Sequence, residues 1–442
     1  MHARATAAAD GGIARRPGVR QGSETAKHAG SVMNEHLRLQ GESVVAPEEL
    51  GLTAVGLEGL SSVMQREVER GHVPGVSMLI ARQGRIGYRQ DFGALRPGGP
   101  AMPDNAIFRI YSMTKPIVSV ALMILLEEGK LFVADPISKF IPALANMKVG
   151  VENNRSLDLV ASKRAITVHD LLRHTSGLTY AFTGNSAVQR RYGAADLFTG
   201  DPANAKQFLT RDLDCAEFIA ELAKLPLIAQ PGESWDYSHS TDVIGHLVEI
   251  VSGKTLGTFL HERIFMPLGM VDTGFHVPAD KQERLAQPFP KDPDGGLPVQ
   301  LIEARDAPLF ESGGGGLFST MDDYARFAQM LYSQGRLEGT RIIARKTLEW
   351  MTSDHLGPNV RIGTPSLLQP GHTFGLGVAV RHGSGMGQTP GTAGEFFWGG
   401  VAGTYFWVAA REELYGLMMV QAPRQRDYFR QLFRTLVYGA LA

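Results

Sequence analysis

The chain has 442 residues, of which 43% are hydrophobic and 20% charged, and this length allows two or three globular domains. Its 44 Lys and Arg residues balance 45 Asp and Glu residues, and no basic run offsets this balance locally, so the composition excludes a nucleic-acid-binding protein. The single cysteine, Cys215, excludes an intramolecular disulfide and a thiolate metal site, and it gives no sign of an oxidising compartment.

The N-terminal segment, residues 1–45, is rich in Ala, Gly, Arg and His and holds no apolar run long enough for a signal peptide. Arg15 and Arg16 are followed by Pro17 instead of an apolar segment, which argues against a twin-arginine signal. We interpret these residues as a disordered or extension arm. No run of about 18 apolar residues occurs, so the sequence predicts no membrane span and a cytoplasmic protein.

Strand-forming segments flank a helical middle. Apolar residues at helical spacing predict a helix over 52–71, and two strands joined by a turn at Gln83-Gly84 follow it. A last amphipathic helix places Tyr428, Leu432, Phe433, Leu436 and Val437 on one face. The predicted strands span residues 75–81, 86–92, 374–381, 395–398, 404–410 and 415–421.

We expect the first and last strands to pair in one antiparallel sheet. The predicted fold class is α/β (α+β), with that sheet flanked by helices and a mostly helical domain inserted into it. The expected boundaries are 46–120 and 300–442 for the sheet domain and 121–299 for the inserted domain.

The first candidate for chemistry is Ser112, which lies three residues before Lys115 at the start of a helix that is apolar throughout. Pro116 suits the first turn of that helix, and the i,i+3 spacing places Ser112 and Lys115 on one face. The helix N-terminus favours a developing oxyanion, and a buried amine can activate the serine hydroxyl. A capping serine with a surface lysine remains the alternative for this motif taken alone.

Two further segments offer groups to such a serine. Tyr237 and His239 lie in a turn-rich loop before an apolar helix, where a tyrosine hydroxyl can point into a cleft. Trp398, Gly399 and Gly400 end a strand; the glycines allow close backbone approach, and a following N–H can complete an oxyanion hole. A packing aromatic and a β-bulge are the alternatives for these two segments.

Together these segments resemble the serine β-lactamase and penicillin-binding-protein superfamily, and within it the class C β-lactamase-like esterases called family VIII carboxylesterases. The resemblance covers roughly residues 50–440. Its motifs are FRIYSMTKPIVSVALMILLEEGKL, LLRHTSGLTY, QPGESWDYSHSTDVIGHLVEIVSGKTL, PLGMVDTGF and SGGGGLFSTMDDYARFAQML.

The resemblance implies roles for individual residues. Ser112 is the expected nucleophile, Lys115 its activating partner and Tyr237 the general base. The backbone N–H groups of Ser112 and Val401 are the expected oxyanion hole. We expect substrate contacts from Trp398, Gly399, Gly400 and His239.

The sequence departs from the β-lactamase pattern at two places. Trp398-Gly399-Gly400 replaces Lys-Thr-Gly, and His239 replaces an asparagine. The first change predicts an apolar wall without a cation for a β-lactam carboxylate, so a neutral short-chain ester is the expected substrate. A β-lactamase, D,D-peptidase or acyltransferase on the same scaffold is the alternative enzyme, and a binding protein that senses acyl ligands is the alternative outside enzymes.

Other catalytic classes fit less well. The sequence has no Gly-x-Ser-x-Gly, Walker A or H-E-x-x-H motif, so no α/β-hydrolase, nucleotide or zinc-protease site is predicted. His169 and His174 do not lie on the same face of a helix. Cys215 is interpreted as a packing residue. We therefore expect no metal, no cofactor and no membrane or nucleic-acid partner; the sequence leaves the oligomeric state open.

Overall fold

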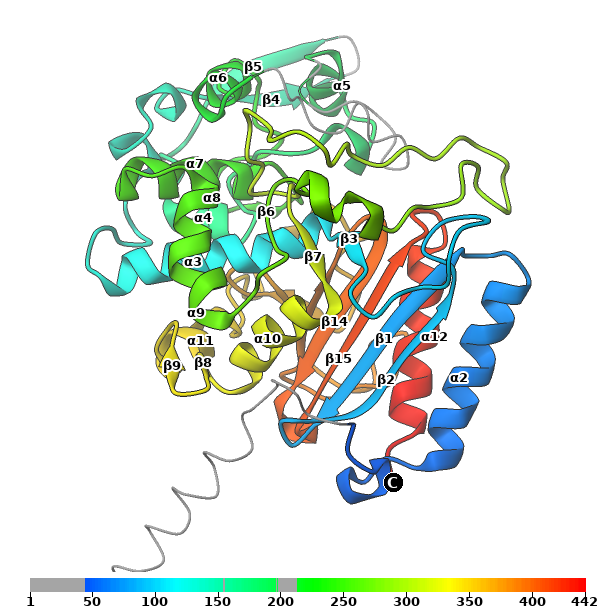
Figure 1. Ribbon diagram of the computed structural model, residues 1–442. Helices are drawn as coiled ribbons and strands as arrows, with labels where there is room; N and C mark the ends of the chain where they lie inside the picture. Colours follow the sequence, from blue (N-terminus) through cyan, green and yellow to red (C-terminus); the bar gives the residue numbers. More distant parts are fainter. Residues whose placement is uncertain (1–43, 154–155, 196, 198–212) are drawn as a thin grey trace, which may run out of the picture. The chain divides into compact units, whose positions relative to one another are not determined.

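A seven-stranded antiparallel sheet forms the centre of the computed structural model, which describes residues 44–153, 156–195, 197 and 213–442 (Figure 1). The predicted N-terminal arm lies almost entirely outside the described residues. The strand order is β11-β12-β13-β14-β15-β1-β2. The strands span Gly75–Arg82 (β1), Arg85–Gly93 (β2), His372–Phe374 (β11), Ala379–Arg381 (β12), Phe396–Gly399 (β13), Gly403–Ala409 (β14) and Leu414–Gln421 (β15).

The first and last predicted strands pair as expected, because β1 lies beside β15 with Leu79 opposite Leu417. Both faces of these strands are buried. On β15, Met418 and Val420 belong to the core on one face, and Leu417 and Met419 to the core on the other. A strand buried on both faces reads as a continuous apolar run, which is how the segment reads in the sequence.

Helices α2 (Ala54–Glu69) and α12 (Arg426–Gly439) pack together on one face of the sheet (Figure 1). Thr53 caps α2 by accepting a hydrogen bond from the Gly56 N–H. The buried face of α12 carries Phe429, Phe433 and Val437. Tyr428, which we placed on that face, is 49% exposed, because the i,i+4 row through Phe433 starts one residue later, at Phe429.

The other face of the sheet carries α10 (Met321–Tyr332), which packs against β1, β14 and β15. In the same core lies α3 (Thr114–Glu127), every residue of which is buried from Thr114 to Leu125. A helix that is apolar all round must be enclosed by protein, and α3 is enclosed as its sequence predicts.

The middle of the chain is richer in strands than expected, because it contains the hairpin of β4 and β5. The remaining helices are α4 (Val168–Leu172), α5 (Ala187–Ala194), α6 (Cys215–Leu222), α7 (Ser240–Ser252), α8 (Leu256–Leu260), α9 (Met266–Leu268) and α11 (Arg345–Met351). The remaining strands are β3 (Ile107–Arg109) with β7 (Phe318–Thr320), β4 (Lys148–Glu152) with β5 (Leu157–Ala161), β6 (Ser234–Trp235) with β10 (Arg361–Ile362), and β8 (Arg336–Leu337) with β9 (Thr340–Arg341).

The predicted strand 374–381 is wrong as a single element, since β11 and β12 are two short strands that pair with each other. Gly377 between them has φ +98°, and the Gly375 N–H donates to the Val378 carbonyl, so the chain reverses there. Among the described helices none alone has the length and apolar character to cross a membrane; only α7 taken with Leu256–Leu268, bent by 77°, meets that criterion.

Candidate active site

Ser112 lies in a single 3₁₀ turn, Tyr111–Met113, that leads directly into α3. Tyr111 is buried and holds φ +43°, a left-handed conformation that is strained for a residue with a large side chain. Its phenol oxygen accepts a hydrogen bond of 2.9 Å from the Ile302 N–H, which anchors the turn. The strained turn leaves Ser112 half-buried between the buried neighbours Tyr111 and Met113.

Lys115 reaches Ser112 from one turn into the helix. Its Nζ lies 3.3 Å from Ser112 Oγ and 2.5 Å from the carbonyl oxygen of Gly314, and the residue is only 1% exposed. The alternative of a surface lysine is therefore wrong. A buried ammonium needs several acceptors, and these two oxygens supply them.

The carbonyl that holds Lys115 belongs to the glycine run 313–316, which the sequence indicated only as a loop. Asp242 fixes this run, since its Oδ1 accepts hydrogen bonds from the Gly314 N–H at 2.8 Å and from Ser312 Oγ at 2.6 Å. A Cβ atom at Gly314 would lie 2.7 Å from Asp242 Oδ2, so only glycine allows this approach. Asp242, at the start of α7, thus positions the carbonyl that positions Lys115.

His239 completes this buried network and does not line the pocket, which corrects our expectation of a substrate contact. It is 1% exposed, and its Nδ1 lies 3.1 Å from Asp242 Oδ2. Burial lowers the pKa of His239, so the neutral ring donates its Nδ1–H to the carboxylate. Burial acts to raise the pKa of Asp242, but the bond from His239 and nearby charges outweigh it and lower that pKa. Asp242 is therefore a buried anion.

Tyr237 precedes α7 in the loop after β6 and lines the same pocket as Ser112. Lys115 Nζ lies 4.5 Å from the centroid of its ring, and the Trp398 Nε1–H donates to its phenol oxygen over 3.2 Å. Both contacts place positive charge or a donor beside the phenol, which stabilises negative charge on its oxygen.

The end of β13 brings Trp398, Gly399 and Val401 to the pocket. Gly400 packs on the backbone before the nucleophile, since a Cβ there would lie 2.3 Å from the carbonyl oxygen of Ile110. The expected close backbone approach is thus present, but Gly400 itself is not among the lining residues.

The pocket has a volume of about 170 Å³. A cavity of about 150 Å³ holds a benzene molecule, so this one suits a small acyl or alcohol group. Phe182, Leu367, Phe397 and Trp398 give it apolar walls, and Gln369, Gln388 and Thr389 add polar groups.

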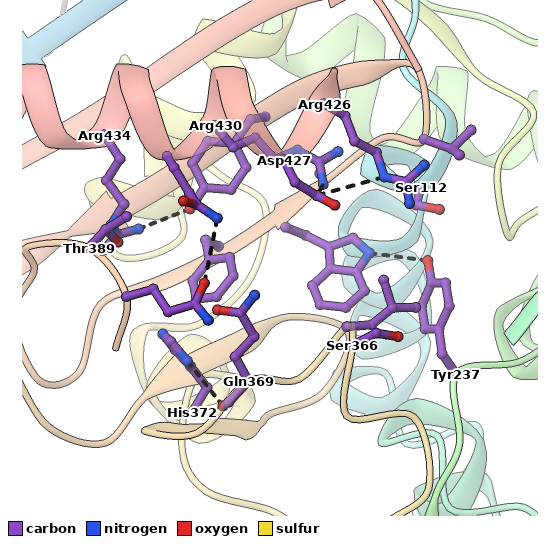
Figure 2. Close-up of a pocket in the computed structure, with 18 of the residues that line it drawn as sticks. Ser112, Tyr237, Ser366, Gln369, His372, Thr389, Arg426, Asp427, Arg430 and Arg434 are labelled. Atoms are coloured by element: carbon purple, nitrogen blue, oxygen red, sulfur yellow. Dashed lines mark hydrogen bonds and ion pairs between the residues drawn. The ribbon is translucent and has the colours of Figure 1, made fainter. Parts of the chain in front are cut away.

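Helix α12 adds a feature that we missed. Arg426, Arg430 and Arg434 lie along the pocket (Figure 2), so the expectation of a wall without cations is wrong. Arg434 forms an ion pair with buried Glu395, which also forms one with Arg381. Their i,i+4,i+8 spacing is the signal that could have placed the three on one helix face.

Arg430 contacts the backbone just after the end of β13. It donates to the carbonyl oxygens of Gly400 and Thr404, and its buried Nε has no hydrogen-bond partner among the described residues. Burial lowers its pKa to about 10, so the guanidinium stays charged at neutral pH.

The chain is similar to proteins of a known family. The chain matches the family model described as Beta-lactamase over residues 60–438. Esterase EstB of Burkholderia gladioli is 31% identical over 385 residues, which cover 82% of this chain and 90% of EstB.

Two solved structures share the fold. EstCE1, described as a hydrolase with promiscuous acyltransferase activity, is 24% identical with a TM-score of 0.69 over 87% of this chain and 98% of its own. Simvastatin synthase (LovD) from Aspergillus terreus is 21% identical with a TM-score of 0.70 over the same shares of the two chains. The chain therefore belongs to the beta-lactamase family and is a serine hydrolase of that fold, of the family VIII esterase type.

Proposed function

We propose that this protein is a carboxylesterase that hydrolyses short-chain esters through an acyl-enzyme on Ser112. The observation that carries this proposal is the grouping of three residues: Ser112 and Tyr237 line one small pocket, and the Lys115 Nζ contacts both, at 3.3 Å from Ser112 Oγ and 4.5 Å from the centroid of the Tyr237 ring. A nucleophile, a cation and a base within reach of one another are what serine acyl transfer needs.

In the proposed first half-reaction, Tyr237 acts as a phenolate that Lys115 and the Trp398 N–H stabilise. It takes the Ser112 proton as Oγ bonds to the ester carbonyl carbon. The oxyanion that forms accepts hydrogen bonds from the Ser112 and Val401 N–H groups. The carbon–oxygen bond to the alcohol then breaks, and Tyr237 returns its proton to the leaving alkoxide.

In the second half-reaction, water is the nucleophile and Ser112 is the leaving group. Tyr237 takes a proton from a water molecule as the water oxygen attacks the acyl carbon. Tyr237 then returns the proton to Ser112 Oγ as the carboxylic acid leaves. Every proton moves between the substrate, water and side chains of this chain, so the proposed mechanism uses no cofactor.

The preference for short chains rests on the size and lining of the pocket. A cavity of about 170 Å³ with aromatic walls accepts a few carbon atoms and gains contact with the indole of Trp398. EstB is an esterase by name, and its 31% identity supports the same reaction type here.

Arg430 favours a second candidate function, the hydrolysis of β-lactams, because its charge can pair with a substrate carboxylate. Acyl transfer to an alcohol instead of water is a variant of the same chemistry, and EstCE1 is described as having such an activity.

A panel of p-nitrophenyl esters from acetate to octanoate, with nitrocefin alongside, separates these functions. We expect the highest kcat/KM for acyl chains of about two to six carbons, given the volume of the pocket. A release of nitrophenol no faster than the uncatalysed background would show a non-catalytic binding protein and overturn the proposal.

A further inference from the structure

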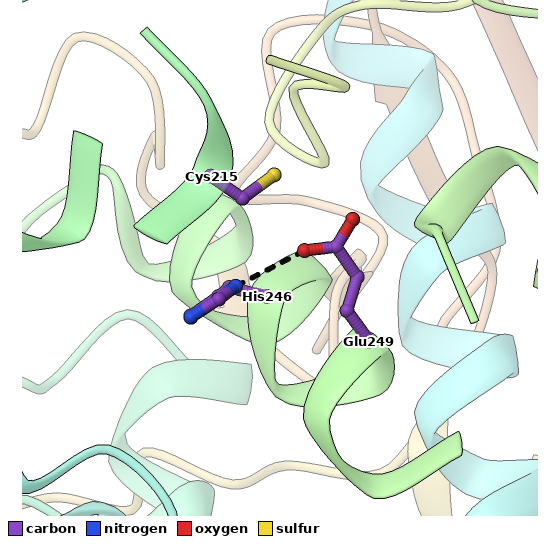
Figure 3. Close-up of side chains that lie close together, drawn as sticks. All are labelled: Cys215, His246 and Glu249. Atoms are coloured by element: carbon purple, nitrogen blue, oxygen red, sulfur yellow. Dashed lines mark hydrogen bonds and ion pairs between the residues drawn. The ribbon is translucent and has the colours of Figure 1, made fainter. Parts of the chain in front are cut away.

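A group of metal-ligating side chains lies away from the pocket, where the start of α6 packs on α7. Cys215 is the first residue of α6, and His246 and Glu249 lie one turn apart on α7. The three side chains point toward one another (Figure 3). Cys215 Sγ, a ring nitrogen of His246 and a carboxylate oxygen of Glu249 all lie within 4.8 Å of one another.

The two α7 residues are already held in position. His246 Nδ1 lies 3.0 Å from Glu249 Oε2, and Glu249 Oε1 accepts a hydrogen bond of 3.1 Å from the Leu256 N–H at the start of α8. One carboxylate oxygen therefore orients the Glu249 side chain, and the other faces the imidazole of His246. A ligand that an outer hydrogen bond orients, as the Leu256 N–H orients Glu249, binds a metal more tightly than a free one.

From this geometry we infer that Cys215, His246 and Glu249 form a zinc-binding site. A thiolate, an imidazole and a carboxylate are all zinc ligands, and the thiolate disfavours Mg²⁺ and Ca²⁺. In a tetrahedral zinc site with bonds of about 2.0–2.3 Å, the ligand atoms lie about 3.3–3.8 Å apart, so shifts of about 1 Å close this group around the ion. Water fills the fourth position.

Charge and protons balance in this site. Binding breaks the Cys215 S–H bond and forms a zinc–sulfur bond, and the proton goes to solvent. The thiolate and the Glu249 carboxylate then neutralise the two charges of zinc, and His246 binds as a neutral ring. A neutral complex is the least costly form at a site where Cys215 is 7% exposed.

This inference differs from our expectation of no metal site, which rested on the single cysteine, the missing H-E-x-x-H motif and the spacing of His169 and His174. Only the packing of α6 on α7 brings Cys215 to the other two ligands. The bound ion would join the first residue of α6 to α7, the helix that carries Asp242 in its first turn. The expected role is structural and is independent of the proposed esterase activity.

The test uses the full chain without an affinity tag, reduced and freed of metal. Adding one equivalent of Co²⁺ should give a sulfur-to-cobalt charge-transfer band in the near ultraviolet, which Zn²⁺ then removes. Because the chain has one cysteine, such a band can come only from Cys215. Zn²⁺ should also remain bound at one per chain after dialysis and raise the Tm, whereas Mg²⁺ should not.

Cys215→Ser and His246→Gln should each lose the retained zinc and the rise in Tm, and His246→Gln should weaken the cobalt band. The matched control is His382→Gln, which changes a half-exposed histidine outside the group and should keep all three signals. If wild-type protein gives no cobalt–sulfur band, or if Cys215→Ser retains zinc as well as wild type, the inference is wrong.

Discussion

The indole N–H of Trp398 donates a hydrogen bond of 3.2 Å to the phenol oxygen of Tyr237. The bond joins the end of β13 to the loop before α7, and both residues line the pocket with Ser112. The tryptophan that replaces a lysine of the β-lactamase pattern thus does more than form an apolar wall: it donates to the oxygen that we propose as the general base.

Removing this donor should impair the chemical step. We expect Trp398→Phe to lower kcat/KM for p-nitrophenyl butyrate about 10- to 100-fold, because a hydrogen bond to a charged group contributes about 1.5–3 kcal/mol. Trp407→Phe is the matched control, since Trp407 is fully buried in the other core and does not line the pocket. Equal losses in the two variants would show that Trp398 only fills space.

Asp242 should act on catalysis without touching the substrate. In Asp242→Asn the glycine run loses its charged acceptor, and the Gly314 carbonyl shifts relative to Lys115. A displacement of about 1 Å in a catalytic group can cost about 100-fold in rate, so we expect kcat to fall by that order. KM for a small ester should change less than about twofold, because Asp242 is not among the pocket residues.

Asp323→Asn controls for the loss of any buried carboxylate. Asp323 is 3% exposed and bonds Thr273, well outside the pocket lining. The Asp323→Asn variant should retain the wild-type kcat. A kcat of Asp242→Asn within threefold of wild type, in protein with unchanged circular dichroism, would remove Asp242 from the positioning network.

Arg430 should decide how the enzyme treats a carboxylate. We expect kcat/KM for the butyrate ester to exceed that for nitrocefin by at least about tenfold, since the end of β13 lacks the lysine and hydroxyl of β-lactamases. In Arg430→Gln the nitrocefin value should fall about tenfold further than the ester value, because a substrate carboxylate then loses the cation that contacts the end of β13. Nitrocefin turnover that equals ester turnover in the wild type would favour the β-lactamase function instead.

The protein should lose stability in mild acid. Burial lowers the pKa of His169 and of His372 from 6.5 to about 4. The unfolded chain binds protons at these residues below pH 6.5, whereas the folded chain binds them only near pH 4. Their contribution to the free energy of unfolding is therefore present above pH 6.5 and lost as the pH falls toward 4. Asp323, whose pKa burial raises to about 6, acts in the opposite direction between pH 4 and 6.

Urea unfolding at pH 7.5, 6, 5 and 4.5 measures this effect. The unfolding free energy of the wild type should decrease over the range, and that of His169→Gln should decrease less. His169 Nε2 lies 2.9 Å from His355 Nδ1, so a glutamine can keep one hydrogen bond there without titrating. A free energy with the same pH dependence in both proteins would contradict the neutral state of the half-buried His169.

The pairing of β1 with β15 and the burial of α3 follow from local sequence patterns, since continuous apolar runs need cover on both sides. The break between β11 and β12 does not, because an apolar run hides the turn at Gly377. The sequence also did not predict that residues of α12 line the pocket. The periodicity of α12 indicates which residues are buried, but not that its arginines reach a site built from distant segments.

Within the site, the sequence motifs indicate the residue types and their order along the chain. They do not indicate how the groups connect through the backbone. Lys115 is held by a carbonyl in a glycine run that reads as an ordinary loop, and His239 reads as a cleft residue until its bond to Asp242 is visible. Contacts of this kind depend on tertiary packing.

Mass spectrometry of the phosphonate-treated protein tests Ser112 as the nucleophile most directly. Intact protein treated with a p-nitrophenyl phosphonate should gain one phosphonyl group, on the peptide that contains Ser112, and should lose esterase activity in step with labelling. Ser112→Ala should take up no label, and its kcat should fall by several orders of magnitude with its Tm unchanged. Labelling of another residue, or a folded Ser112→Ala variant with wild-type activity, would contradict the acyl-enzyme mechanism.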